Sequence, residues 1–492
     1  MKKQILVMIL SLIACVSVNA QQYLYGTTYE GGANSLGTIY RVDHNGMNFQ
    51  KVYDFDSING GKPLSGLTLA NGKLYGFTST GGPVSNPGAT VGLGSFFEFD
   101  PINNSLTVIE SIDDKSKIGH SINHSPLLTT DGMLYFASRE VGIDSRSVLS
   151  MYDPNSSTLT ILDTLTSSEG SIQAKLMQAS NGHIYVTTAN GNANNYGGVI
   201  RWNTNSNQIE VLHSSQGPNF GVNNPKEYYN SRSPLLEGSD GSLYGLSVLG
   251  GNFVGTNDQG VGCFFKIKLD GSGYSTLHPF DDQLQDKGYL PYGGLVEKNG
   301  VIYGTTSEEG AINVNSGTIF SYTLSNGNFD FIHILDLEGT RPKGTLTESS
   351  NGRFYFTTTG EPNINNGNLI EFNPVNGAVT QRHSFGGSDG VKPYYDQLAL
   401  VDFTKLSVSA SHSLALGVSV FPNPMKDMIS ITLEESGKIE IIKILDLKGL
   451  ELFIDKSMSS EAKVNTSFLS TGLYLLYIQT DSGSTTRKII KE

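Results

Sequence analysis

Short apolar runs recur along most of the chain, and glycine, asparagine, aspartate or serine bounds each of them. Within the runs, apolar residues alternate with polar or small ones, which is the period of a β-strand with one buried face. The most regular run has a tyrosine at its centre, which occurs at intervals of 50 to 60 residues, at Tyr25, Tyr75, Tyr135, Tyr185, Tyr244, Tyr303 and Tyr355. A period of this length is typical of a supersecondary unit that buries its faces against its neighbours.

Each unit is predicted to contain four short strands. The first, such as residues 64–69, is followed by an Asn-Gly or Asp-Gly pair, which favours a tight hairpin turn. The tyrosine run is the second strand, a run such as 37–42 is the third, and 52–55 and its counterparts are the fourth. Seven such units predict an all-β fold in which residues 21–402 form a seven-bladed β-propeller.

The two ends of this repeat region complement each other. The first unit begins at its second strand, because no first strand precedes Tyr23. Residues 393–401 have the pattern of a first strand, but no tyrosine run follows them. We therefore expect 393–401 to complete the N-terminal blade and to close the ring without a covalent link.

The N-terminal segment is predicted to direct secretion. Lys2 and Lys3 precede an apolar run at 5–14 and small residues near Ala20, which indicates a signal peptide over residues 1–20. The alternative is a lipoprotein, since the four residues ending at Cys15 resemble a lipobox. The apolar run is too short to span a bilayer, so no transmembrane segment is predicted.

The composition changes near the C-terminus. Residues 403–416 are rich in Ser, Ala and Leu and are interpreted as a linker. In residues 417–492 the tyrosine units stop, Lys and Glu become more frequent, and alternating runs predict a small Ig-like β-sandwich.

Charge limits the class of partner. The formal net charge of the chain is −13, and charged residues make up only 16% of it. A surface of this sign repels nucleic acid and anionic lipid, so no nucleic-acid partner is expected.

The units resemble the tandem repeats called GloVer. Members of that family have a leucine-tyrosine-glycine-threonine-threonine strand, a double-glycine loop and a histidine-containing fourth strand. The double glycines here are Gly31-Gly32, Gly81-Gly82 and Gly250-Gly251. Three units depart from the pattern, because Phe136, Val186 and Phe356 stand where the glycine would follow the tyrosine. The resemblance covers about residues 23–401 and implies little about activity.

The tail is similar to the type A C-terminal sorting domain of the type IX secretion system of Bacteroidetes. Four motifs carry the resemblance in order, namely Val418-Ser419-Val420-Phe421-Pro422-Asn423-Pro424 with Asp427, Ile444-Leu445-Asp446-Leu447-Lys448-Gly449, Leu469-Ser470-Thr471-Gly472-Leu473-Tyr474-Leu475, and Lys488-Ile489-Ile490-Lys491. The resemblance implies that residues 417–492 engage the type IX machinery. It also implies passage through the periplasm to the outer-membrane surface or the extracellular space.

No linear motif for catalysis, metal binding or a cofactor is found, so we assign no catalytic residue, metal ligand or cofactor. Four histidines, His213, His278, His333 and His383, share one register in successive fourth strands. Fourth strands lie at the outside of separate blades, so we interpret these histidines as structural.

A binding surface is expected where the long loops gather. Second-to-third and fourth-to-first loops share one face of a propeller, and function concentrates on long loops held by a rigid scaffold. Aromatic rings next to charges suit a sugar or a peptide. The candidate binding residues on these loops are Tyr228, Tyr229, Arg232, Asp281, Tyr289 and Tyr292. The alternative is that the tyrosines only pack the loops onto the disc.

We therefore expect a secreted or cell-surface binding or adhesion module without catalytic activity, with a glycan or a peptide as its ligand. The alternative is an extracellular polysaccharide-active hydrolase or lyase, since a propeller can assemble acidic residues from several blades without a linear motif.

Overall fold

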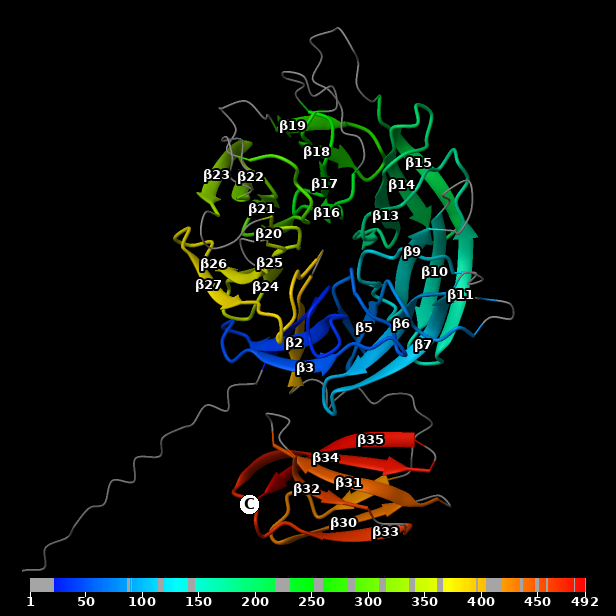
Figure 1. Ribbon diagram of the computed structural model, residues 1–492, viewed down its shortest axis with the longest axis vertical. Helices are drawn as coiled ribbons and strands as arrows, with labels where there is room; N and C mark the ends of the chain where they lie inside the picture. Colours follow the sequence, from blue (N-terminus) through cyan, green and yellow to red (C-terminus); the bar gives the residue numbers. More distant parts are fainter. Residues whose placement is uncertain are drawn as a thin grey trace, which may run out of the picture.

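The computed structural model shows an all-β protein in which a ring of sheets is followed by a small C-terminal domain (Figure 1). It describes residues 22–491 except 86–88, 90, 114–117, 140–146, 217–230, 252–259, 281–287, 309–315, 336–340, 361–365, 395–396, 404–417, 434–436, 447–450, 457–458 and 482. The predicted signal peptide and nearly all of the predicted linker lie outside the described residues.

In the described residues, the ring consists of seven four-stranded antiparallel sheets, which are the blades of a β-propeller. From the axis to the rim, blade 1 contains β28 (Ala399–Asp402), β1 (Gln22–Thr28), β2 (Thr38–Asp43) and β3 (Gln50–Asp54), and blade 2 contains β4 (Thr68–Ala70), β5 (Lys73–Phe77), β6 (Gly92–Asp100) and β7 (Ser105–Asp113). Blade 3 contains β8 (Leu127–Leu128), β9 (Leu134–Arg139), β10 (Ser147–Asp153) and β11 (Thr158–Thr164), and blade 4 contains β12 (Met177–Gln178), β13 (Ile184–Thr188), β14 (Gly198–Asn203) and β15 (Gln208–Ser214). Blade 5 contains β16 (Leu236–Glu237), β17 (Ser242–Ser247), β18 (Cys263–Lys268) and β19 (Ser275–Pro279). Blade 6 contains β20 (Val296–Lys298), β21 (Val301–Thr306), β22 (Thr318–Thr323) and β23 (Asn328–Ile334), and blade 7 contains β24 (Thr347–Glu348), β25 (Phe354–Thr358), β26 (Asn368–Phe372) and β27 (Val379–Ser384).

Blade 1 joins the two ends of the ring. β28 is antiparallel to β1, with Tyr23 opposite Val401 and Tyr25 opposite Ala399. Val401 is fully buried, and the ring of Phe403 packs edge-on against Tyr23 at 5.5 Å between centroids. Segments more than 370 residues apart therefore share one sheet and one apolar core.

The glycine after the repeated tyrosine makes room for a ring on the next strand. A Cβ built on Gly245 would lie 2.3 Å from the ring of Phe265, its partner on β18, and a Cβ on Gly304 would lie 2.4 Å from Phe320 on β22. In the blades without the glycine, the larger second-strand residue faces a residue smaller than phenylalanine on the third strand. The partners of Phe136, Val186 and Phe356 are Ser150, Ile200 and Ile370. The summed side-chain volume of each facing pair therefore stays similar, whichever of the two strands has the larger residue.

The recurring histidines hold neighbouring blades together. His278 on β19 stacks on Phe329 of blade 6 with ring centroids 3.8 Å apart, and His383 on β27 stacks on Phe49 of blade 1 at 3.7 Å. His213 on β15 makes the same stack with Tyr274 of blade 5 at 4.3 Å. These contacts support the structural interpretation of the histidines.

The C-terminal domain has two sheets that face each other across an apolar core. One sheet contains β29 (Val418–Phe421), β30 (Met428–Leu433) and β33 (Glu461–Asn465), and the other contains β32 (Glu451–Asp455), β31 (Ile439–Leu445), β34 (Gly472–Thr480) and β35 (Gly483–Lys491). Ile431 and Ile444, from opposite sheets, are both fully buried. This is a small β-sandwich, as the sequence predicts.

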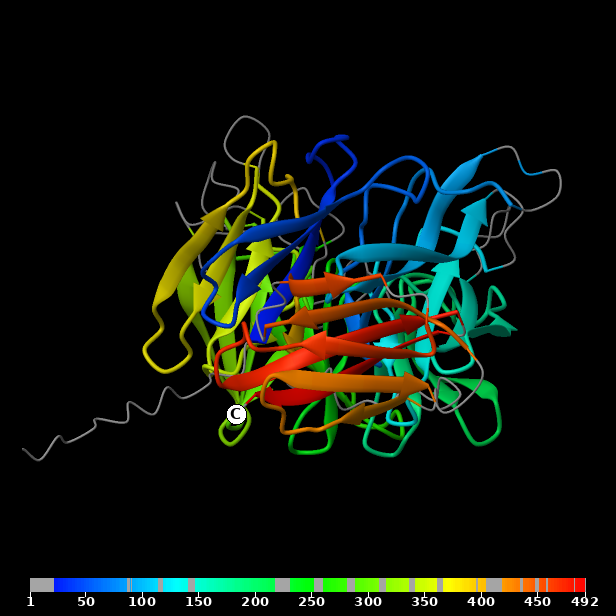
Figure 2. The same ribbon diagram turned by 90° about the horizontal axis from the view of Figure 1, so that it is seen from below.

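The C-terminal domain lies beside the rim of the ring, next to blades 1 and 2, and leaves both faces of the disc uncovered (Figures 1 and 2). Ile102 and Asn103, in the turn between β6 and β7, line a small crevice with Lys443 and Tyr477 of the C-terminal domain. The described residues contain no helix with the length and apolarity needed to cross a bilayer.

Candidate functional site

The innermost strands are shorter than the sequence pattern predicts. Residues 64–69 are expected to form a strand, but β4 begins at Thr68, and β8, β12, β16 and β24 have two residues each. The blades converge at the axis, where there is little room for seven long innermost strands side by side. The residues before each innermost strand are therefore left to line the centre of the ring.

A contact across the ring locates the axis. The ammonium group of Lys175, which precedes β12 of blade 4, donates a hydrogen bond to Oε1 of Gln397, which precedes β28 of blade 1, at 2.5 Å. Blades 1 and 4 are three blades apart in a ring of seven, the largest separation that such a ring allows. Both side chains must therefore reach the axis.

His124 lies within the electrostatic reach of Lys175 and of a second basic residue, Arg232. Nε2 of His124 lies 2.6 Å from the carbonyl oxygen of Gln173, to which the neutral ring donates a hydrogen bond. Burial, together with the positive charges of Lys175 and Arg232, lowers the pKa of His124 to about 4. His124, Lys175 and Arg232 therefore belong to one electrostatic group, although they come from three blades.

Two tyrosines and a lysine complete the group. The ammonium of Lys343 donates to the hydroxyl of Tyr394 at 2.9 Å and lies 4.5 Å from the centroid of that ring and 5.0 Å from the centroid of Tyr292. Burial raises the pKa of Tyr292, and the nearby Arg232 acts against this rise. We call the whole set the axial cluster, and its members are His124, Lys175, Arg232, Tyr292, Lys343, Tyr394 and Gln397.

The charge of the axial cluster opposes that of the protein. Burial lowers the pKa of Lys175 to about 8, so this lysine is still mostly protonated at neutral pH. The partner that the structure gives it, Gln397, is a neutral amide. Glu308, whose charge reaches Tyr292, is itself 3.5 Å from the guanidinium of Arg341. Among the described residues of a chain with a formal charge of −13, the axial cluster thus brings together the basic side chains of Lys175, Arg232 and Lys343.

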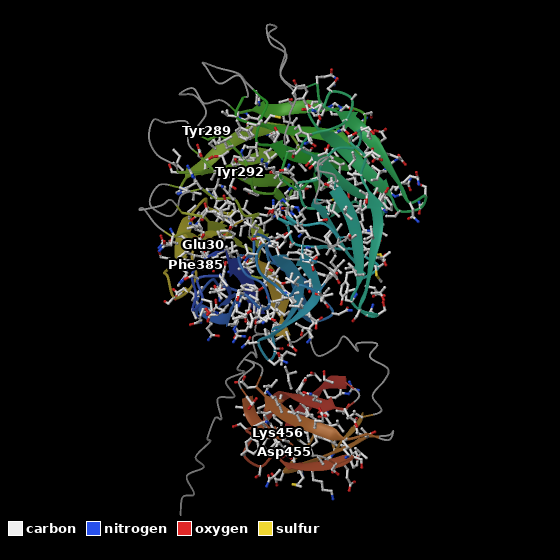
Figure 3. The ribbon with its side chains drawn as sticks, turned by 45° about the vertical axis from the view of Figure 1, so that its right-hand side comes forward. Glu30, Tyr289, Tyr292, Phe385, Asp455 and Lys456 are labelled. Carbon is white, nitrogen blue, oxygen red and sulfur yellow. The ribbon has the colours of Figure 1, made fainter. Side chains whose placement is uncertain are left out.

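The structure unites two of the six residues named from sequence. Arg232 and Tyr292 both belong to the axial cluster. Tyr289 lies on the same face of the ring as Tyr292 (Figure 3). It is half-buried, and its backbone pairs with that of Glu308 through two hydrogen bonds. The other three, Tyr228, Tyr229 and Asp281, lie outside the described residues.

Sequence reasoning missed Lys175, Lys343, His124 and Gln397. The sequence signal that could have found them is the position of each residue counted back from a recurring leucine. This leucine begins or precedes each innermost strand. Three residues before this leucine the chain has Leu64, His124, Gln173, Arg232, Tyr292 and Lys343, and one residue before it has Gly66, Pro126, Lys175, Pro234, Gly294, Thr345 and Gln397. Positions at one register of successive blades lie at one height along the axis.

No group of three or more His, Cys, Asp or Glu side chains with the geometry of a metal site occurs within the described ranges. Cys263 is buried, and its sulfur lies 3.3 Å from the hydroxyl of Ser247. Other blades have a second hydroxyl at this place, as in the pair of Thr306 and Thr318 at 2.7 Å. Cys263 therefore fills a position that belongs to strand packing.

His124 should make the protein sensitive to acid. Its folded-state pKa of about 4 is below the ordinary value of 6.5, so the unfolded chain binds a proton in this range and the folded chain does not. Stability from this group is complete above about pH 6.5 and is lost as the pH falls toward 4, by about 3 kcal/mol. In denaturant titrations at pH 7 and pH 4.5, His124→Gln is expected to lose less stability than the wild type. His44→Gln is the control, and an equal loss in all three proteins would contradict the prediction.

Comparison with known proteins agrees with the architecture. The family model for the Gloeobacter/Verrucomicrobia repeat matches residues 13–125, 121–336 and 222–412, and the model for the secretion system C-terminal sorting domain matches 419–492. No curated protein matches the chain.

Among solved structures, the periplasmic gluconolactonase of Pseudomonas aeruginosa is similar, with a TM-score of 0.51 and 17% identity over 77% of this chain and 99% of that one. A protein from Lactobacillus plantarum has a TM-score of 0.51 and 12% identity over 77% of this chain and 99% of its own. At these identities the likeness concerns the propeller fold.

Proposed function

Because the chain belongs to the Gloeobacter/Verrucomicrobia repeat family and ends in a type IX secretion sorting domain, we propose that it is a binding module of the cell surface or the extracellular space, delivered there through the periplasm. The sorting domain implies export. The repeats then have to account for what the exported protein does.

The axial cluster is the observation that supports binding. Two of its members, His124 and Arg232, are suited to hold a ligand rather than to exchange protons with one. Nε2 of His124 is engaged with the backbone of Gln173, and the guanidinium of Arg232 is a planar group that only donates hydrogen bonds. Lysine ammonium groups next to tyrosine rings, as at Lys343, supply charge and apolar surface together. The C-terminal domain leaves this centre uncovered, because it lies at the rim (Figure 2).

One observation favours the alternative of a polysaccharide-active hydrolase or lyase. An amine with a pKa of about 8, as at Lys175, is suited to take up or give a proton near neutral pH. If Lys175 acts in this way, its replacement should abolish turnover.

A panel of immobilised glycans and peptides tests the proposal. The secreted protein is applied to the panel, and both its retention and the release of soluble products are measured. We expect retention of the protein without release of products. If soluble products are released by the wild type and not by Lys175→Met, the enzymatic alternative is established instead. If no member of the panel retains the protein, the proposed function is contradicted.

A further inference from the structure

The first and the last motif of the C-terminal domain lie against each other. The backbone amide of Ile490, in the last strand β35, donates a hydrogen bond to Oδ1 of Asn423 at 2.8 Å. The carbonyl oxygen of Ile490 accepts one from the amide of Met425 at 2.7 Å. The ammonium of Lys491 lies 3.3 Å from Oδ1 of Asp427. We call these five residues the clasp, and it joins the loop after β29 to the end of β35.

The same loop also reaches the third motif. Thr466, which follows β33, is fully buried, and its amide donates to the carbonyl oxygen of Asp427 at 2.8 Å. Its hydroxyl donates to the carbonyl oxygen of Lys426 at 3.1 Å. The amide of Leu469, the first residue of the third motif, donates to the carbonyl oxygen of Thr466 at 3.0 Å. The loop after β29 therefore holds both the segment that leads into β34 and the end of β35.

The strand register brings the four motifs to one end of the sandwich. Leu445, in the described part of the second motif, lies opposite Leu475 of the third, and the third and fourth motifs pair along β34 and β35. The apolar core also extends to the other end, where Ile439 lies opposite Thr480. Motifs that served only the fold would be expected along the whole core. Their gathering at one end indicates a surface that another molecule recognises.

The polar side chains of the clasp contribute little to the stability of the sandwich. The side chain of Asp427 is 75% exposed, and an ion pair that water reaches stabilises a fold only weakly. Asn423 is exposed as well. β35 is also held by β34 along all of its nine residues and by the fully buried Ile489. The clasp therefore determines where the last residues lie rather than whether the domain folds.

We propose that Asn423 and Asp427 are positioning residues of the export signal. They fix the end of β35 against the loop after β29, so that the four motifs present one folded surface to a protein of the type IX machinery. The machinery then recognises the folded end of the domain and not a linear C-terminal tail. This inference rests on the proposed delivery of the protein and names the part of the domain that carries the signal.

The experiment follows export and local opening in the same variants of the full chain. In a host with type IX secretion, immunoblots measure the share of the chain in the medium and on the cell surface. Hydrogen exchange measures the opening of β35 in chain purified from the periplasm of a host without that system. Asn423→Ala removes the acceptor for Ile490, so exchange in β35 should be at least about tenfold faster and export at least about tenfold lower. Asn423→Asp keeps an oxygen acceptor and should behave like the wild type.

The ion pair is tested by exchanging its charges. Asp427→Lys places a second positive charge beside Lys491 and should lower export. Asp427→Lys combined with Lys491→Glu brings opposite charges together again and should restore export.

Ile439→Val separates positioning from stability. Ile439 is fully buried at the end of the core away from the clasp, and the loss of one methyl group there should lower the melting temperature of the domain by about 5 °C. The loss of one exposed hydrogen bond in Asn423→Ala should lower it by no more than this. Ile439→Val should nevertheless be exported like the wild type, because its clasp is intact.

The outcomes are distinct. If Ile439→Val and Asn423→Ala lose export to the same extent, stability alone decides export and the inference is overturned. It is also overturned if Asn423→Ala is exported like the wild type or if its β35 exchanges no faster, and for Asp427 if the exchanged charges do not restore export. The proposed delivery stands in these cases as long as a chain that ends after Leu416 is retained in the periplasm. If that shortened chain is exported, both fail. Loss of export in Asn423→Ala and Asp427→Lys, with recovery in Asn423→Asp and in the charge exchange, would establish the two positioning residues.

Discussion

Val401→Asp is expected to prevent the ring from closing and to lower the free energy of unfolding by about 4 kcal/mol or more. Val401 is fully buried on β28, opposite Tyr23 of β1, and a carboxylate there has no route to water. β28 is also the innermost strand of blade 1, so it joins the end of the repeats to their beginning within one sheet. Urea unfolding followed by tyrosine fluorescence and far-UV circular dichroism measures the loss.

The matched control is Val375→Asp. Val375 is 88% exposed in the turn between β26 and β27, so the same substitution should change stability by no more than about 0.5 kcal/mol. A chain that ends after residue 398 should behave like Val401→Asp or fold less well. If both the shortened chain and Val401→Asp unfold at the wild-type urea concentration, the pairing of β1 with β28 does not stabilise the ring.

Truncation after Leu416 is expected to abolish export while leaving the propeller folded. The C-terminal domain has its own apolar core, which includes Ile431 and Ile444, and it meets the ring at the rim. The two parts should therefore unfold independently, and the sorting domain alone should carry the export signal. In a host with type IX secretion, immunoblots of the medium, the cell surface and the periplasm should place the truncated chain in the periplasm.

Ile444→Asp provides a variant of full length. Ile444 is fully buried, so a carboxylate there should unfold the sorting domain and block export as completely as its removal. Leu452→Asp, at a position 37% exposed on β32, is the control that should still be exported. Appearance of the truncated chain in the medium at wild-type levels would show that the export signal lies elsewhere.

The fold was predictable because every blade repeats the same local arrangement of strands and turns. The tyrosine run, the glycine beneath a third-strand ring and the tight turns act between residues close in sequence, so a pattern of one unit describes the geometry of all. Which loops share a face was predictable for the same reason, because the order of strands in a meander determines it.

The sequence by itself thus determined the four-stranded units and the C-terminal sorting domain that implies export. Only the tertiary structure decided that Lys175 meets Gln397 across the axis, 222 positions apart, and that the charge of Arg232 acts on both His124 and Tyr292. Periodicity within a unit reports which side of a strand is buried, but it carries no information about which blades stand opposite one another. That depends on the closure of the ring, which brings the segments before the innermost strands to a common centre and turns separate basic residues into one site.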